Sequence, residues 1–434
     1  MNYRKIKIIK IIILLIAVAV FQTKLIAGPF NIAYYPAQDP IVNTLRSALF
    51  YPGDKQFSFW HKQFFMESNF YDMGFVYDIN IFKNRPSLSY KLWLQPKPAN
   101  LITLLPGLGT NYTGISLTAL AEVFYLQGYS VLAISSVFNW EFYESASSSL
   151  TPGYTPVDSL DIYYALTKII NHLEKKYASR IKDNILVGYS LGGLHTLYIA
   201  DYESKNRDLS IGFKRYLALN PPVNILYSMK MVDDFYMVAD NWTQPEITEK
   251  MYKGMRLYRK VLDKATNTTA TLPFTVNEAK YIIGLSFHLS LVELISSIHE
   301  RHDFGILKSK SSWFSRSALY KEIDSYTYYD YLLTFFKKNY AEQTGKEVFL
   351  SEFNERSGLK AIENTLKNNK KIRVIHTEND FLLKDQDRTW LDATLWDRIT
   401  TINKGGHLGY IYNEQALELI SNNVKLTDSK TDKL

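Results

Sequence analysis

Residues 185–193, with the sequence ILVGYSLGG, decide how the rest of the chain is interpreted. The apolar run 185–187 is typical of a buried strand, and a helix-like stretch follows the serine. Between them lies a Gly-x-Ser-x-Gly pattern, in which Gly188 and Gly192 leave room for a sharp strand-to-helix turn with Ser190 at its tip. The alternative is a glycine-bounded turn with a capping serine. The strand before the turn and the helix after it favour Ser190 as a nucleophile.

Strand-like and helix-like segments alternate on both sides of this turn. The predicted strands are 75–82, 89–94, 101–105, 130–136, 185–187, 216–219, 372–377 and 399–403, and the predicted helices are 115–127, 158–177, 194–202, 386–396 and 408–421. Asp158 is placed as the N-cap of its helix. An alternating order of this kind predicts an α/β protein with a mostly parallel sheet and helices on both faces.

The alternation stops between Val223 and about Asn369. Within this interval, 285–302 and 326–340 have apolar residues at helical spacing. An insertion of roughly 145 residues is too long for a loop, so we expect a helical cap over the edge of the sheet. The predicted organisation is a leader 1–27, an unassigned N-terminal extension 28–70, a core in two parts 71–223 and 370–423, a cap 224–369 between them, and a polar tail 424–434.

The element order and the Gly-x-Ser-x-Gly pattern resemble the α/β-hydrolase superfamily over residues 71–423, the cap excepted. The resemblance implies an α/β-hydrolase sheet, with the cap inserted before the strand that leads to the catalytic acid. It also implies a triad in the order serine, acid, histidine. The matching positions are Ser190, Asp380 and His407, the last within the sequence GGHLG. His407 would take the proton of Ser190, and Asp380 would orient the imidazole.

Other residues compete for two of these roles. Glu378, Asp385 and Asp387 are nearby substitutes for the acid. The remaining histidines are His61, His172, His195, His288, His299, His302 and His376. Two of them, His299 and His302, have a spacing that suits a metal, but they lack an evident acidic partner, which favours a packing or surface role. We predict no metal site and no cofactor.

The sequence LPGLG at 105–109 follows the predicted strand 101–105. In the family that the chain resembles, a His-Gly-x sequence often supplies one oxyanion-hole N–H group at this place. Here Pro106 replaces the histidine and the glycine is kept. The donor positions of the family correspond to the backbone N–H groups of Leu108 and Leu191. The alternative is a plain glycine turn, and the lack of a His-Gly-Gly-Gly run argues against the esterase and lipase branch that uses one.

Composition and charge exclude several classes of protein. The 434 residues are 46% hydrophobic, which excludes a disordered chain, and the chain has no cysteine, which excludes disulfides and thiolate sites. The formal charge of +7 comes mostly from five basic residues of the leader, Arg4, Lys5, Lys7, Lys10 and Lys24. The remaining chain is nearly neutral, so no nucleic-acid partner is predicted.

The leader 1–27 has the pattern of an export signal. A cationic start is followed by the apolar run 11–21 and by a small residue, Ala27, at a possible cleavage point. The alternative is an uncleaved N-terminal anchor, although the 16 residues of 6–21 are fewer than the ~20 that span a bilayer. We expect a periplasmic or secreted protein that contacts a membrane only through an uncleaved leader.

Together these features predict an exported serine hydrolase that cleaves carboxylic esters through an acyl-enzyme. The cap is rich in aromatic residues, which favours a small-molecule ester with a hydrophobic acyl or aryl group. The same triad would serve a peptidase or amidase, as in prolyl aminopeptidases, or an acyltransferase. A non-catalytic binding protein on a hydrolase scaffold is the alternative from another class. The sequence leaves the oligomeric state open.

Overall fold

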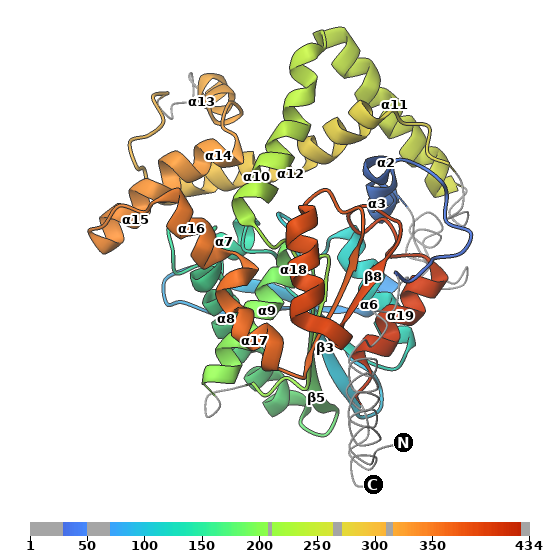
Figure 1. Ribbon diagram of the computed structural model, residues 1–434. Helices are drawn as coiled ribbons and strands as arrows, with labels where there is room; N and C mark the ends of the chain where they lie inside the picture. Colours follow the sequence, from blue (N-terminus) through green and yellow to red (C-terminus); the bar gives the residue numbers. More distant parts are fainter. Residues whose placement is uncertain (1–28, 50–69, 207–210, 264–270, 310–315, 427–434) are drawn as a thin grey trace, which may run out of the picture.

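An eight-stranded sheet forms the centre of the computed structural model, which describes residues 29–49, 70–206, 211–263, 271–309 and 316–426 (Figure 1). The strands are β1 (Phe75–Ile79), β2 (Leu88–Trp93), β3 (Ala99–Leu105), β4 (Ser130–Ala133), β5 (Ile181–Tyr189), β6 (Arg215–Leu219), β7 (Ile372–Thr377) and β8 (Ile399–Ile402). Their order in the sheet is β1-β2-β4-β3-β5-β6-β7-β8. Strand β2 pairs antiparallel with both β1 and β4, and the strands from β4 to β8 in this order pair in parallel.

Helices cover both faces of the sheet and bury two apolar clusters. The helices of the core are α5 (Phe70–Met73), α6 (Ile115–Leu126), α7 (Trp140–Ala146), α8 (Thr155–Tyr177), α9 (Leu191–Lys205), α18 (Asp385–Leu395) and α19 (Glu414–Val424). Along β5, Leu186 belongs to the cluster under α8 and α9, whereas Ile185 and Val187 belong to the cluster under α6 and α19. Because the pleat sends successive side chains to opposite faces, a strand buried on both sides is apolar throughout.

The predicted fold class is confirmed, with two local corrections. Helix α8 begins at Thr155, so the prediction of Asp158 as its N-cap is wrong. Pro156 in the first turn sets the helical φ earlier than Asp158 does, because proline is pre-organised for this position. The last helix, α19, begins at Glu414 after the N-cap Asn413, and not at residue 408.

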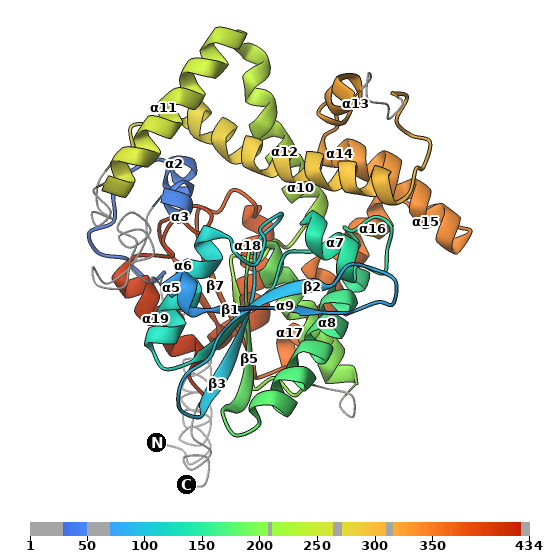
Figure 2. The same cartoon turned by 180° about the vertical axis from the view of Figure 1, so that it is seen from behind.

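The residues between β6 and β7 that the structure describes form helices and no strand. These elements are α10 (Ile225–Tyr236), η2 (Met237–Asn241), α11 (Gln244–Asp263), α12 (Val276–Arg301), α13 (Arg316–Ile323), α14 (Tyr328–Tyr331), η3 (Leu332–Phe336), α15 (Lys337–Thr344), α16 (Leu350–Ser357), η4 (Leu359–Ile362) and α17 (Glu363–Asn368). Helices α10, α11 and α12 stand above the sheet in both views (Figures 1 and 2). The last part of the interval contacts α8 and α9 instead, so it lies on the flank of the core.

Helix α12 is the central element above the sheet. It begins with a capping box between Thr275 and Glu278 and packs against α10, α7 and α2. Among the described residues it is also the one helix long and apolar enough to cross a membrane, but half of its most apolar window is buried inside the molecule. Apolar side chains on several sides are what a helix between two layers requires.

The described part of the N-terminal extension, 29–49, is tied to the core. Phe30 forms a parallel bridge with Ile402 at the edge of β8, and the short helices α2 (Pro40–Thr44) and α3 (Arg46–Leu49) follow. Helix α2 packs against α12. The predicted leader 1–27 lies outside the described residues, as do residues 427–434 of the predicted tail.

Candidate active site

Ser190 occupies the turn between β5 and α9 in a backbone conformation that side chains rarely adopt. Its φ is 54° and its ψ is −125°. Built side chains show why glycines flank it, since a Cβ at Gly188 would collide with the carbonyl group of Gly192, and a Cβ at Gly192 would collide with the carbonyl group of Leu105. The Ser190 N–H donates to the Leu219 carbonyl oxygen at 2.8 Å. Strained residues of this kind concentrate at functional sites.

Three residues from separate loops join in a continuous hydrogen-bonded path. The Ser190 Oγ lies 2.9 Å from His407 Nε2, and His407 Nδ1 lies 2.9 Å from Asp380 Oδ2. All three side chains are buried. The structure therefore brings together the three residues that the resemblance marked. With its Nδ1–H donated to Asp380, a neutral His407 presents Nε2 as the acceptor for the serine proton.

Asp380 is held by more partners than the histidine alone. Its Oδ2 accepts a hydrogen bond from Asn220 Nδ2 at 2.6 Å, and its Oδ1 accepts one from the Leu382 N–H at 2.9 Å. Burial alone would raise the pKa of this carboxyl group, but the facing His407 and these hydrogen bonds lower the pKa below its usual value. Asp380 is therefore ionised at neutral pH, as a group that stabilises an imidazolium must be.

Two of the competing acids are engaged elsewhere. Asp387 forms an ion pair with Lys360 at 2.8 Å, and Asp385 forms one with Arg388 at 3.3 Å. His407 is thus paired with Asp380, in the loop between β7 and α18, rather than with a residue of α18.

Residues that the sequence analysis did not single out complete the support of the site. Asn220 directly follows β6 and links Asp380 to Tyr410, whose hydroxyl group donates to Asn220 Oδ1 at 2.7 Å. The backbone N–H of His407 donates to Thr44 Oγ1 at 2.9 Å. The position of Asn220 at the carboxyl end of a parallel strand was a usable signal. No local pattern marks Thr44.

The loop 405–409 packs directly against α2. Gly405 and Gly406 have φ values of 123° and 59°, which favour glycine. A Cβ at Gly406 would collide with the carbonyl group of Pro40, and one at Gly409 would collide with that of Asn43. The N-terminal extension therefore forms one wall of the histidine loop, a role that the sequence analysis left unassigned.

Both predicted oxyanion donors lie beside the serine. Leu108 and Leu191 line the same cavity as Ser190. A Cβ at Gly107 would stand 3.3 Å from the Ser190 Cβ, which shows how closely the loop after β3 approaches the serine. Leu191 is the first residue of α9, where backbone N–H groups have no partner inside the helix.

A narrow, largely apolar cavity of about 60 Å³ opens at Ser190. Its core residues are Leu108, Phe138, Gly153, Thr155, Asp158, Ser190, Leu191, Pro222 and Leu382, and its cap residues are Ile225, Ser228, Met229, Val232, Phe287 and Tyr328. The lining shows that helices α10, α12 and α14 close the space above the serine.

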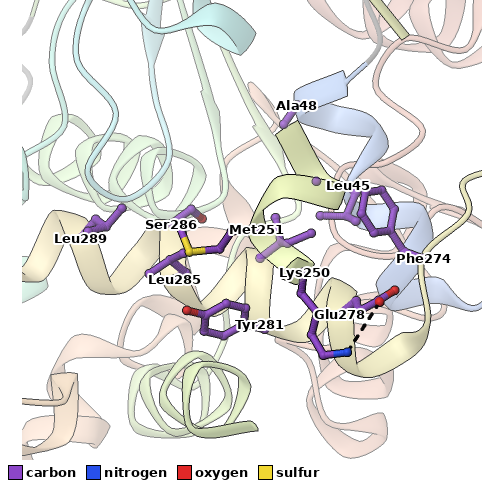
Figure 3. Close-up of a pocket in the computed structure, with 12 residues that line it drawn as sticks. Leu45, Ala48, Lys250, Met251, Phe274, Glu278, Tyr281, Leu285, Ser286 and Leu289 are labelled. Atoms are coloured by element: carbon purple, nitrogen blue, oxygen red, sulfur yellow. Dashed lines mark ion pairs between the residues drawn. The ribbon is translucent and has the colours of Figure 1, made fainter. Parts of the chain in front are cut away.

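A larger cavity, of about 350 Å³, lies elsewhere, between α11, α12 and the N-terminal extension (Figure 3). Leu45 and Ala48 line it together with residues of both cap helices. Two of these, Lys250 and Glu278, form an ion pair in which Lys250 Nζ lies 3.9 Å from Glu278 Oε1. Its lining includes neither Ser190 nor His407, so size alone does not identify the reactive site.

Three of the other described histidines have structural surroundings. His376 bonds Asp392 at 2.8 Å, and His288 pairs with Asp324 at 3.0 Å. Burial lowers the pKa of His195 to about 3, so it is a neutral core residue. In the described ranges, no group of three histidine, aspartate or glutamate side chains is arranged to hold a metal ion.

Several solved structures are similar to this chain at low sequence identity. No family model and no curated protein matches the chain. Est1E from Butyrivibrio proteoclasticus is similar in structure, with 11% identity, a TM-score of 0.36, and coverage of 80% of this chain and 98% of that one. An esterase from Pyrococcus furiosus has 12% identity and a TM-score of 0.40 over 81% and 89% of the two chains. A thioesterase domain from the curacin biosynthetic pathway has 12% identity and a TM-score of 0.35 over 81% and 99%.

The sheet order and the turn at Ser190 are those expected of an α/β-hydrolase, so the resemblance inferred from the sequence is confirmed at the level of the fold.

Proposed function

We propose that this chain, with its α/β-hydrolase fold, is a serine hydrolase that cleaves carboxylic esters through an acyl-enzyme on Ser190. The observation that supports this function best is the continuous path from Ser190 to His407 to Asp380, with two contacts of 2.9 Å, which starts at a serine that lines a cavity. A serine hydroxyl group is a weak nucleophile unless a base takes its proton, and this path supplies the base and its orienting acid.

The reaction proceeds in two steps, the acylation of Ser190 and the deacylation that follows it. Ser190 Oγ attacks the ester carbonyl carbon while its proton passes to His407 Nε2, and the N–H groups of Leu108 and Leu191 receive the oxyanion. Collapse of the tetrahedral intermediate breaks the ester C–O bond, and the departing alcohol takes the proton from His407. Water then attacks the acyl carbon and loses a proton to His407. The bond to Ser190 Oγ breaks, Ser190 Oγ takes that proton back from His407, and the carboxylic acid leaves.

The acyl group in this proposal occupies the cavity beneath the cap. The apolar lining by Phe138, Met229 and Val232 favours a hydrophobic acyl or aryl group. A cavity of about 60 Å³ is well below the roughly 300–1,000 Å³ of common ligand sites, so longer acyl chains require the cap helices to move apart. Nitrophenyl esters of increasing acyl length test this preference, and equal turnover of short and long chains would contradict it.

Export is a separate part of the proposal and rests on the leader pattern of residues 1–27. After expression in a bacterial host, the mature protein is expected outside the cytoplasm with its N-terminus near Gly28. Mass spectrometry of the protein from each cell fraction shows whether residues 1–27 have been removed. An intact leader in the membrane fraction would favour the uncleaved anchor instead.

A fluorophosphonate probe tests the nucleophile directly. Wild type is expected to be labelled on Ser190, and Ser190→Ala is expected to lose both labelling and ester hydrolysis. The control is Ser325→Ala, at a site where the hydroxyl group donates locally to the Glu322 carbonyl oxygen. Parallel ester, aminoacyl and amide substrates separate an esterase from a peptidase. A biological role that survives in Ser190→Ala would indicate a binding protein.

A further inference from the structure

A buried carboxyl group lies in the wall of the cavity that contains Ser190. Asp158 sits in the first turn of α8, is 1% exposed, and lines this cavity together with the serine. Its neighbours in the lining are mostly apolar, and they include Phe138, Val232 and Leu382. A carboxyl group in such surroundings needs partners, because burial of an unpaired polar group is unfavourable.

One oxygen of this carboxyl group is bonded and the other is not. Asp158 Oδ2 accepts a hydrogen bond from the Gly153 N–H at 2.8 Å. Its Oδ1 has no hydrogen-bond partner among the residues that the structure describes. The nearby Tyr331 hydroxyl group donates to the Pro152 carbonyl oxygen instead.

The electrostatic surroundings of Asp158 favour its neutral form. Burial, with a smaller contribution from the like charge of Asp161, raises the pKa of Asp158 well above its usual value, and the bond from Gly153 only partly opposes this. No lysine or arginine forms an ion pair with it in the described part of the chain. In the neutral acid, Oδ2 serves as the acceptor for Gly153, so the proton belongs on Oδ1.

The buried carboxyl group of Asp233 differs from that of Asp158, because both of its oxygens are bonded. On α10, Asp233 accepts hydrogen bonds through both oxygens, from the N–H groups of Tyr328 at 2.9 Å and Tyr329 at 3.0 Å. If the role of Asp158 were only to hold Gly153, one carboxyl oxygen would be used. The second oxygen would stay buried without a hydrogen bond, which lowers the stability of the fold. The unpaired oxygen therefore points to a ligand that enters the cavity.

We propose that Asp158 determines substrate specificity, by donating a hydrogen bond from its neutral Oδ1–H to an oxygen atom carried by the acyl group of the ester. The preferred substrates are then esters of hydroxy-, oxo- or alkoxy-substituted acids, rather than of plain hydrocarbon acids. This inference rests on the proposed esterase function and narrows it to a class of acyl group.

The test compares chromogenic esters of equal acyl length, with and without one hydroxyl, oxo or methoxy group at successive carbons. In the wild type, at least one oxygenated ester is expected to exceed its parent in kcat/KM by roughly 10- to 100-fold, since a site built to hydrogen-bond a substrate discriminates against analogues that lack the group. Asp158→Asn keeps an acceptor for Gly153 and a donor for the substrate, so most of this preference should remain. Asp158→Leu should remove it and raise turnover of the parent ester.

Fluorophosphonate labelling of Ser190 in each protein separates the two proposals. If the wild type is not labelled, the proposed serine-hydrolase function is wrong. If the wild type is labelled but shows no preference for oxygenated esters, only the proposed role of Asp158 is wrong. A preference that persists in Asp158→Leu also overturns it. Should that variant fail to fold, as judged by its melting temperature, Asp158→Ala carries the same expectation.

Aminoacyl esters test whether Asp158 acts as a carboxylate instead. A carboxylate that paired with an ammonium group would make these esters the preferred ones, and Asp158→Asn would then abolish the preference. This result would overturn the assignment of Asp158 as a neutral donor.

Discussion

Replacing Thr44 by valine tests whether the N-terminal extension supports the histidine loop. Valine has nearly the shape of threonine but cannot accept a hydrogen bond. The change removes the partner of the buried His407 N–H, which lies 2.9 Å from Thr44 Oγ1. It also removes the donor to the Pro40 carbonyl oxygen at 3.0 Å. Thr44→Ser keeps the hydroxyl group and is the matched control.

The expected size of the effect follows from these two bonds. A buried donor left without its acceptor costs about 1–3 kcal/mol of folding free energy. Thr44 is 6% exposed and His407 is 4% exposed, so water does not readily replace the lost hydroxyl group. Some relaxation of the His407 backbone is expected, and displacements near 1 Å can lower turnover about 10²-fold. We therefore expect kcat/KM to fall roughly 5- to 100-fold, with Thr44→Ser close to wild type.

Urea unfolding and ester hydrolysis measure the two effects separately. A loss of stability with full activity would show that Thr44 supports the fold without positioning His407. If Thr44→Val matched Thr44→Ser in both measurements, the extension would not support the active site, and this part of the reasoning would be refuted.

Three further outcomes are expected. Asp380→Asn should lower kcat about 10⁴-fold in an ester assay, because the amide no longer fixes the reactive tautomer of His407. Since the pKa of Asp380 is lowered in the folded protein, its contribution to stability is full above about pH 4 and is lost as the pH falls further. Acid melting curves of wild type and Asp380→Asn should therefore converge at low pH, and a gap that widened there would contradict this sign. Gly406→Ala should destabilise the protein more than Gly345→Ala, since both glycines have positive φ but only Gly406 faces the backbone of Pro40. Equal melting temperatures for these two variants would argue against that contact.

The parts of the structure that follow from local physics could be predicted. The strand 372–377 is β7 in the structure, and its apolar side chains are buried on both faces, with Ile372 and Val374 in one cluster and Ile375 in the other. The glycines of the turn at Ser190 were predictable from their spacing. For Gly188 the close backbone neighbour is Gly192 within the same turn, whereas for Gly192 it is Leu105 at the end of β3. The convergence of Asp380 and His407 follows from topology, since both come after parallel strands whose carboxyl ends share one edge.

Contacts between distant segments could not be predicted in this way. Thr44 and His407 are 363 residues apart, and Asn220 and Tyr410 are 190 apart, so no periodic pattern reports that they meet. Asp158 was misassigned for a different reason. An aspartate near the start of a helix usually caps it, and here Pro156 starts the helix sooner, which leaves the carboxyl group inside the first turn.

The division between core and cap suggests how chemistry and selectivity are separated in this fold. The hydrogen bonds that hold Asp380 and His407 come from the core and from α2, through Asn220, Leu382 and Thr44. The cap supplies side chains to the cavity wall instead, from α10, α12 and α14. Substitutions on these helices change the space for the acyl group while the triad keeps its support. Asp158 belongs to both parts of this division, because it lies on a core helix and yet lines the cavity.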